Sequence, residues 1–230
     1  DFESPLLHKL TWPKVSWAPG LFDLDNDTDL DLFFANGHLN SVSGDNRQSN
    51  LLFENDGRGR FTDISEISGV LATGNRIHRS AIFADYDDDG RVDIFVTVNG
   101  QQVEDGQGNN IFDPNQGKGI LFHNETKGDN NWIKVRLEGT KSNRDGFGST
   151  VSITVGTIKQ KQALVSGQGY FSSHAKEIYF GLGSIKSIDK IEVSWPSGMD
   201  QTFENIPANQ TVYILEGETL HQNTSHLSVK

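Results

Sequence analysis

The stretch LFDLDNDTDLDLFFANG, residues 21–37, places five aspartates at alternate positions directly before an apolar segment. These are Asp23, Asp25, Asp27, Asp29 and Asp31. Carboxylates this close repel one another, so a folded chain tolerates them only if the segment stays solvated or if a cation neutralises it. The stretch therefore predicts a cation-binding turn that leads into a strand.

A second copy of the pattern occurs at residues 81–100, AIFADYDDDGRVDIFVTVNG. Both copies run from an aromatic residue through D-x-D-x-D to a further aspartate, an apolar segment and Asn-Gly. Asp85 aligns with Asp23, so the repeat period is 62 residues (85 − 23). One D-x-D-x-D match fits a solvated turn that binds nothing equally well, whereas two copies in register favour cation binding.

The spacing within both turns suits calcium, which takes about six to eight oxygen ligands and accepts flexible geometry. We name residues 23–31 loop 1 and residues 85–93 loop 2, and number each loop from its first aspartate. Positions 1, 3, 5 and 9 are carboxylates in both loops, and position 7 would offer a backbone carbonyl. The sequence thus predicts two calcium ions, and the candidate metal residues are Asp23, Asp25, Asp27, Asp29, Asp31, Asp85, Asp87, Asp89, Arg91 and Asp93.

Two alternatives to this metal assignment are weaker. An EF-hand needs a bidentate glutamate at position 12 between two helices, but position 12 is Phe34 or Val96, each within a predicted strand. Magnesium wants near-ideal octahedral geometry with few dedicated carboxylates. Position 6 is Gly90 in loop 2 but Thr28 in loop 1, so we expect loop 1 to bind calcium more weakly.

The composition indicates a folded, mostly β protein. The 230 residues include 24 glycines, 10% aromatic and 34% apolar residues, and long periodic apolar stretches are few. The net charge of −11, with scattered basic residues, argues against nucleic-acid binding. No apolar run approaches the length of a membrane span, and the absence of cysteine excludes disulfides and thiolate chemistry.

Three regions follow from the strand and turn patterns. Residues 1–130 contain the two repeats with their acidic turns, which is typical of propeller blades; because two blades cannot close a ring, other blades must come from the same precursor or another chain. Residues 131–217 contain short alternating runs that predict a β-sandwich-like domain. Residues 218–230 read as a mobile polar tail. The fold class is thus all-β, a partial propeller of about two blades followed by a sandwich.

Other motifs carry weaker hypotheses. His38 and His78 lie near the acidic repeats and could add ligands, although a packed or surface histidine is the simpler interpretation. The turn SNRDGFG (142–148) suits a hairpin with positive-φ positions, and SGQGYFSS (166–173) suits packing rather than phosphate binding. The long insertion at 103–119 is either a contact surface or a floppy segment. No catalytic residue is assigned, because neither H-E-x-x-H nor G-x-S-x-G occurs.

The repeats resemble the calcium-binding FG-GAP/VCBS-type repeats of integrin α-subunit propellers and of exported bacterial proteins. FFANGHLNS (33–41) and NLLFENDGRGRFTD (50–63) fit the same repeats. The second region resembles an ASPIC/UnbV domain of the cartilage acidic protein-like family, through motifs that include residues 131–153, 166–173, FGLG (180–183) and VSWPSG (193–198).

This resemblance implies the C-terminal portion of a larger secreted or surface-exposed protein. The expected function is a calcium-stabilised scaffold for adhesion or interaction, whose loops bind a protein or a glycan, without catalysis. Two alternatives stay open. The chain could belong to an exported enzyme whose active site lies in other blades, or its free strand edges could build a surface assembly or filament.

Overall fold

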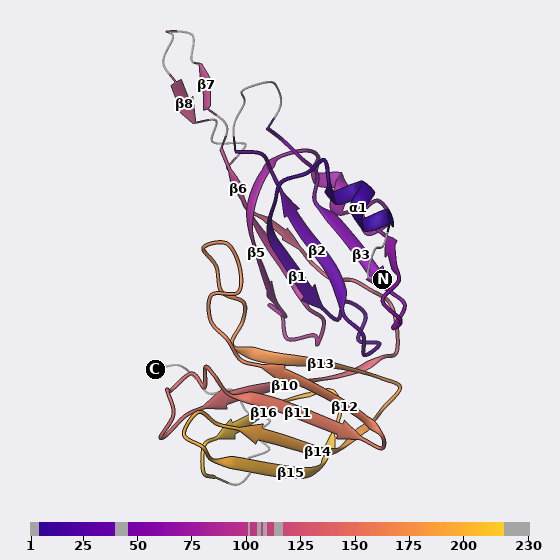
Figure 1. Ribbon diagram of the computed structural model, residues 1–230, viewed down its shortest axis with the longest axis vertical. Helices are drawn as coiled ribbons and strands as arrows, with labels where there is room; N and C mark the ends of the chain where they lie inside the picture. The colour runs from indigo at the N-terminus through magenta and orange to yellow at the C-terminus, as the bar shows by residue number, and fades with distance from the viewer. Residues whose placement is uncertain are drawn as a thin grey trace.

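A computed structural model of the chain describes residues 5–39, 46–100, 102–104, 107, 110–112 and 117–218. The fold is all-β, with two blade-like sheets of a partial propeller followed by a β-sandwich (Figure 1), as the sequence predicts. The predicted tail beyond residue 218 and much of the 103–119 insertion lie outside the described residues.

Each blade begins with a strand, an acidic loop and a second antiparallel strand. The first blade has the order β1-β2-β3-β4 and the second has the order β5-β6-β9. Their bounds are β1 Ser16–Phe22, β2 Asp31–Asn36, β3 Leu51–Asn55, β4 Phe61–Asp63, β5 Ile77–Ala84, β6 Asp93–Asn99 and β9 Ile120–Phe122. Helix α1 (Pro5–Thr11) precedes the first blade, the 3-10 helix η1 (Val70–Thr73) connects the blades, and β7 (Gln102–Glu104) pairs with β8 (Asn110–Phe112) in a protruding hairpin (Figure 1).

The two blades share one aromatic core. Phe33 of β2 is fully buried, and its ring lies 6.1 Å from the ring of Phe83 in β5 and 6.3 Å from that of Phe122 in β9, measured between centroids. The rings of Phe22 and Phe83 are 4.8 Å apart. Gly20 lies so close to the Phe83 ring that a side chain there would overlap it. The sheets therefore pack face to face, as neighbouring blades do.

The sandwich consists of a three-stranded sheet, β13-β10-β16, and a four-stranded sheet, β12-β11-β14-β15. Their bounds are β10 Asn131–Glu138, β11 Thr150–Val155, β12 Ile158–Ala163, β13 Glu177–Gly183, β14 Ser187–Ser194, β15 Asp200–Pro207 and β16 Gln210–Leu215. Strands β10 and β16 are parallel, and the other pairs are antiparallel. Alternate residues such as Ile133, Val135 and Leu137 point into a core between the two sheets.

The segment 142–148 is not a hairpin turn, contrary to the sequence-based expectation. It connects β10 to β11, which belong to different sheets. Within the segment only Gly146 and Gly148 have positive φ. Glu216, which directly follows β16, holds the start of this connection. Its Oε2 accepts hydrogen bonds from the backbone N–H groups of Thr140, Lys141 and Ser142 at 2.7–2.8 Å. The glycines thus serve a crossover between layers.

The segment 166–173 packs along the free edge of β5. Ser172 Oγ lies 3.5 Å from the Ala81 carbonyl, and shortly after the segment the Ala175 N–H donates to the Phe83 carbonyl at 3.2 Å. The Tyr170 ring lies 4.8 Å from the Trp17 ring of β1. A connection of the sandwich therefore covers the first strands of both blades (Figure 1).

Candidate metal sites in two acidic loops

Both acidic loops have the same internal structure. Loop 1 joins β1 to β2, and loop 2 joins β5 to β6. Asp23 accepts hydrogen bonds from the backbone N–H groups of Asp27 and Thr28, both at 3.0 Å. In loop 2, the carboxylate of Asp85 accepts the equivalent bonds from residues 89 and 90 at 3.0 and 2.8 Å. The first aspartate therefore organises each turn by the same contacts.

The aspartate at position 9 connects each loop to a more distant strand of its blade. Asp31 accepts the N–H of Leu24 at 2.8 Å and that of Asn55, at the end of β3, at 2.9 Å. Asp93 accepts the N–H of residue 86 at 3.0 Å and that of Asn124, just after β9, at 2.8 Å. Each blade thus holds both ends of its loop through buried carboxylates.

The backbone conformations of the loops also match. Position 4 has φ of 61° at Asn26 and 62° at Asp88, and position 6 has φ of 91° at Thr28 and 87° at Gly90. Glycine adopts this left-handed geometry freely, whereas a β-branched residue is strained there. Loop 1 therefore keeps the shape of loop 2 despite its unfavourable residue at position 6.

The structure brings some of the candidate metal ligands close together. Carboxylate oxygens of Asp23, Asp25 and Asp27 lie within 4.8 Å of one another in loop 1. In loop 2, Asp85 and Asp87 form such a group with Asp93, and Asp87 forms another with Asp89 and a histidine. Asp31, at the end of loop 1, serves as a hydrogen-bond acceptor, and Asp29 has one buried carboxylate oxygen. The Arg91 side chain pairs with Asp89.

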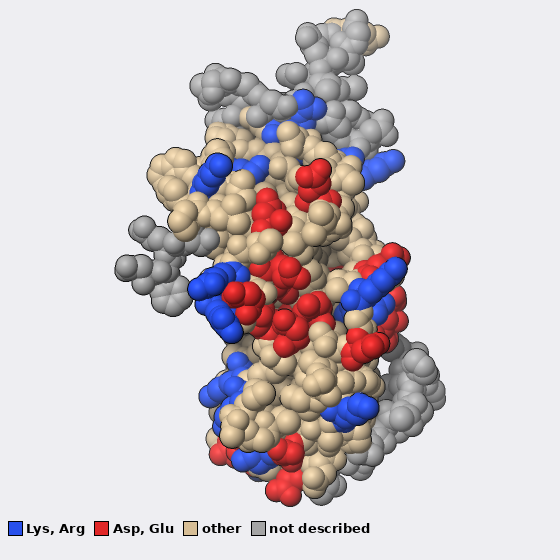
Figure 2. Space-filling view, turned by 90° about the vertical axis from the view of Figure 1, so that its right-hand side faces the viewer, with Lys and Arg blue, Asp and Glu red and all other residues tan. Residues whose placement is uncertain are grey.

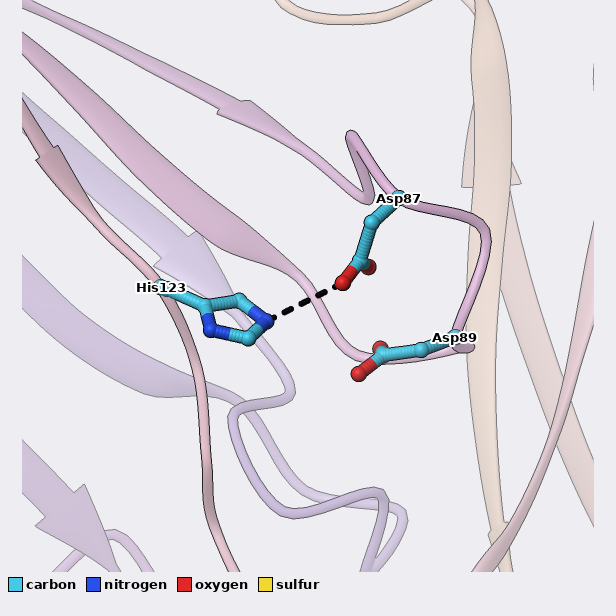
Figure 3. Close-up of side chains that lie close together, drawn as sticks. All are labelled: Asp87, Asp89 and His123. Atoms are coloured by element: carbon cyan, nitrogen blue, oxygen red, sulfur yellow. Dashed lines mark hydrogen bonds and ion pairs between the residues drawn. The ribbon is translucent and has the colours of Figure 1, made fainter.

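That histidine is His123, which the sequence analysis missed (Figure 3). It follows β9, and its Nε2 lies 3.1 Å from Asp87 Oδ2. The repeat alignment held the signal, because LLFEN (51–55) matches ILFHN (120–124) and places Glu54 opposite His123. His78 is buried instead, with Nδ1 2.9 Å from the Asn36 carbonyl, and neither it nor His38 belongs to the groups that the described residues form.

Without a cation, burial raises the pKa of several loop carboxyls. The pKa of Asp23 and that of Asp31 rise to about 7, mainly through burial and further through neighbouring aspartates. Burial and the charges of Asp27 and Asp25 raise the pKa of Asp29 to about 6. Burial also raises the pKa of Asp93. Crowded carboxylates resist ionisation in this way unless a positive charge compensates them.

The residues present fit a hard divalent cation. The donors are carboxylate oxygens held on rigid turns, and the Asp29 Oδ1 is buried without a hydrogen-bond partner. Asp23, Asp25 and Asp27 would hold an ion in loop 1, and Asp87 would hold one in loop 2 together with Asp85 and Asp93 or with Asp89 and His123. Such an ion would cancel carboxylate charge and rigidify the connection between two strands.

The sandwich contacts both loops directly. The N–H of Gly183 in β13 donates to the Asn26 carbonyl at 2.8 Å, and Asn130 Nδ2 donates to the Asp25 carbonyl at 3.0 Å. The Tyr179 hydroxyl accepts the Asp85 N–H at 3.2 Å. Figure 2 shows acidic side chains gathered across the middle of one face, where the sandwich meets the blades.

Comparison with known proteins agrees with this architecture. Residues 23–96 match the model of the FG-GAP-like repeat, and residues 139–221 match the model described as ASPIC and UnbV. The two matches lie in the order that the motifs predict, with the repeat model first and the ASPIC and UnbV model after it.

Among individual proteins, the chain is similar to Cartilage acidic protein 1 of Homo sapiens and of Mus musculus. It is 25% identical to the human protein over 217 residues, which cover 94% of this chain and 30% of the relative. It is 25% identical to the mouse protein over 232 residues, which cover 99% of this chain and 33% of that relative. The chain thus spans about a third of the length of the curated relatives it matches.

Proposed function

We propose that the chain is a calcium-stabilised interaction module of an extracellular or cell-surface protein, without catalytic activity of its own. The observation that carries this proposal is the duplication of the acidic loop. Two turns 62 residues apart (85 − 23) share their carboxylate positions, their hydrogen bonds and their positive-φ residues. Such agreement favours a common ligand over a chance cluster of acidic residues.

Calcium is the favoured ion for both loops. All carboxylate donors are hard oxygens, and the alternating spacing provides several of them to one point. Calcium is abundant outside cells, which suits an extracellular location, and the similarity to Cartilage acidic protein 1 is compatible with it. Among the described residues, no helix has the length and apolar character of a membrane span.

The calcium-stabilised blades would present their connections to a protein or glycan ligand. Large apolar side chains stand exposed around the blades, with Ile67, between β4 and η1, 86% exposed and Phe171, in the sandwich connection that covers the blades, 94% exposed. Exposed apolar groups on well-supported loops are typical of contact surfaces, although single ones are common on any protein. Further blades, from the same precursor or from another chain, would complete the propeller.

Isothermal titration calorimetry with calcium tests the metal part of this proposal. We expect two binding events per chain, and magnesium at the same concentration should give much weaker heats because it resists flexible, carboxylate-rich sites. Asp25→Asn and Asp87→Asn should each remove one event. Heats of dilution alone at millimolar calcium would contradict the proposal.

A further inference from the structure

The two acidic loops differ in the positive charges around them. In loop 2, Lys134 of β10 places Nζ 2.8 Å from Asp85 Oδ2 and 2.6 Å from Asp88 Oδ1. The side chains of Lys134 and Asp85 are only 3% and 0% exposed. Arg91 pairs with Asp89 in the same loop. The negative charge of loop 2 is therefore partly neutralised by side chains of the protein itself. The most buried of these is Lys134, which belongs to the sandwich.

The Lys134 ammonium group is buried in the structure and does not form a surface ion pair with Asp85. It lies 5.4 Å from the centre of the Trp132 ring, and that ring packs against Gly90 so closely that a side chain at residue 90 would overlap it. A buried ion pair of this kind is costly to break, because removal of one partner leaves the other charge uncompensated. Lys134 therefore holds loop 2 against β10 whether or not a metal ion is present.

Within the described part of the chain, loop 1 has no such cationic partner. Among the described residues, no lysine or arginine forms an ion pair with any of its five aspartates. Position 7 carries a further carboxylate, Asp29, where loop 2 carries Arg91. One oxygen of Asp29 is buried without a hydrogen-bond partner. The repulsion within loop 1 is therefore left for an external cation to cancel.

The uncompensated loop also carries contacts with the sandwich. Asn26 accepts the Gly183 N–H from β13, and its Nδ2 donates to the Gly90 carbonyl of loop 2 at 3.1 Å. Gly181 packs against the Asp23 carboxylate with no space for a side chain. A change in the shape of loop 1 must therefore alter the contacts that β13 makes with the first blade.

We propose that Lys134 acts as the resident cation of loop 2, so that loop 1 is the calcium-dependent half of the interface and calcium controls the docking of β13 onto the first blade. This inference rests on the proposed calcium function. It assigns different roles to two loops whose sequences look equivalent.

Hydrogen exchange of the wild-type chain, in calcium and in EDTA, tests the inference without any mutation. We expect the amides of Thr28 and Gly183 to exchange at least tenfold faster in EDTA, because both depend on the shape of loop 1. The amide of Gly90 should change less than threefold. Equal responses of the two loops, or a larger response at Gly90, would overturn the inference.

Substitution of Lys134 provides the second arm, with Lys159→Met as the matched control. Lys159 pairs with Glu192 at the surface, 3.2 Å apart, and its side chain is 56% exposed. Lys134→Met should make the Gly90 amide calcium-dependent and tighten calcium binding at loop 2 at least fivefold, since a neighbouring positive charge is removed. Lys159→Met should leave both values unchanged, and unchanged values in Lys134→Met would contradict the proposed role.

Calorimetry on the same samples separates the two proposals. If calcium gives no binding heat in the wild-type chain, the calcium function itself fails. If calcium binds but protects both loops equally, the function stands and the role of Lys134 is refuted.

Discussion

Thr28 has a left-handed backbone conformation that a β-branched residue adopts only with strain. Its φ of 91° lies in a region that costs a β-branched residue about 1–3 kcal/mol. We expect Thr28→Gly to raise the free energy of unfolding by about 1 kcal/mol in urea titrations, because the released strain exceeds the added chain entropy of glycine.

The equivalent residue of loop 2 gives the matched control. Gly90→Ala should destabilise the chain, since Gly90 has φ of 87° and faces the Trp132 ring without space for a side chain. A destabilising Thr28→Gly substitution would show that the loop 1 backbone is held by contacts specific to threonine.

Glu216 is a buried carboxylate satisfied entirely by hydrogen bonds. Burial alone would raise its pKa, but donors from Ser197, Ser142 and Lys141 outweigh this and hold the pKa at about 2. Because the folded-state pKa lies below the ordinary value of 4.5, this group stabilises the fold above pH 4.5, and the contribution is lost as the pH falls toward 2.

Glu216→Gln tests this role. The amide replaces the charged acceptor of the N–H groups of residues 140–142 with a weaker neutral one and no longer titrates, so the variant should have a lower Tm at pH 7 and a smaller loss of Tm between pH 4.5 and pH 2. Glu192→Gln, which alters a surface ion pair, should leave the Tm nearly unchanged. Equal Tm values for Glu216→Gln and wild type would show that the Glu216 carboxylate does not stabilise the loop between β10 and β11.

His78 makes stability depend on pH near neutrality. It is fully buried, and burial, aided by Arg76 and Arg79, lowers its pKa from 6.5 to about 4 despite backbone hydrogen bonds. Between these pH values the unfolded chain binds a proton at residue 78 that the folded chain does not, so the contribution of His78 to stability falls as the pH drops from 6.5 to 4. The shift corresponds to about 3 kcal/mol.

The pH dependence of the unfolding free energy in urea checks this prediction. His78→Gln should lack this loss of stability between pH 6.5 and pH 4, which appears as a change of slope relative to wild type, whereas His8→Gln, at an exposed position, should reproduce the wild-type slope. Identical slopes for His78→Gln and wild type would mean that His78 does not cause the pH dependence.

At the scale of elements, the face-to-face packing of the two blades depends on few aromatic side chains. Phe33→Ala removes a fully buried ring between β2, β5 and β9 and should cost about 3–5 kcal/mol in urea unfolding. Phe95→Ala on β6, where the ring is 40% exposed, should cost less than 1 kcal/mol, roughly as surface changes do. Similar costs for the two variants would contradict a shared core.

The sequence predicts strands well where one face is buried and poorly where neither is. Strands β10, β11 and β13 place buried apolar residues at alternate positions, while Lys134, Ser152 and Gly181 between them are buried as well and break the strict period. Strand β15 has no such signal in the sequence, because only Ile206 of its residues is buried and no apolar alternation marks it. Strand β1 carries Pro19 and Gly20, which are tolerated because β1 is an edge strand.

Some residues of the candidate site could be predicted from the sequence, and others could not. The carboxylates of both loops could be predicted because one short segment supplies each set. Lys134 could not, because it comes from another domain and no local pattern marks its approach to Asp85. His123 lies between these cases, since alignment of the repeats places it opposite Glu54.

For the whole molecule, the position of the loops gives a cation a role beyond one turn. Each loop joins two strands of a blade and also contacts the sandwich, through Gly183 in one case and through Lys134 and Tyr179 in the other. Charge compensation in the loops therefore affects the blades, the sandwich and their relative placement together. A protein that presents loops to a ligand benefits from such rigidity, because rigid loops lose less conformational entropy on binding.

The most direct test is a crystal structure of the chain grown in millimolar calcium, with anomalous differences recorded to identify the ion. We expect one calcium in each loop at about 2.3–2.6 Å from its ligands, with Asp23, Asp25 and Asp27 binding it in loop 1 and Asp87 binding it in loop 2 with Asp85 and Asp93 or with Asp89 and His123. Well-ordered loops that contain only water, or an ion in neither carboxylate cluster, would contradict a cation as the reason for these crowded aspartates.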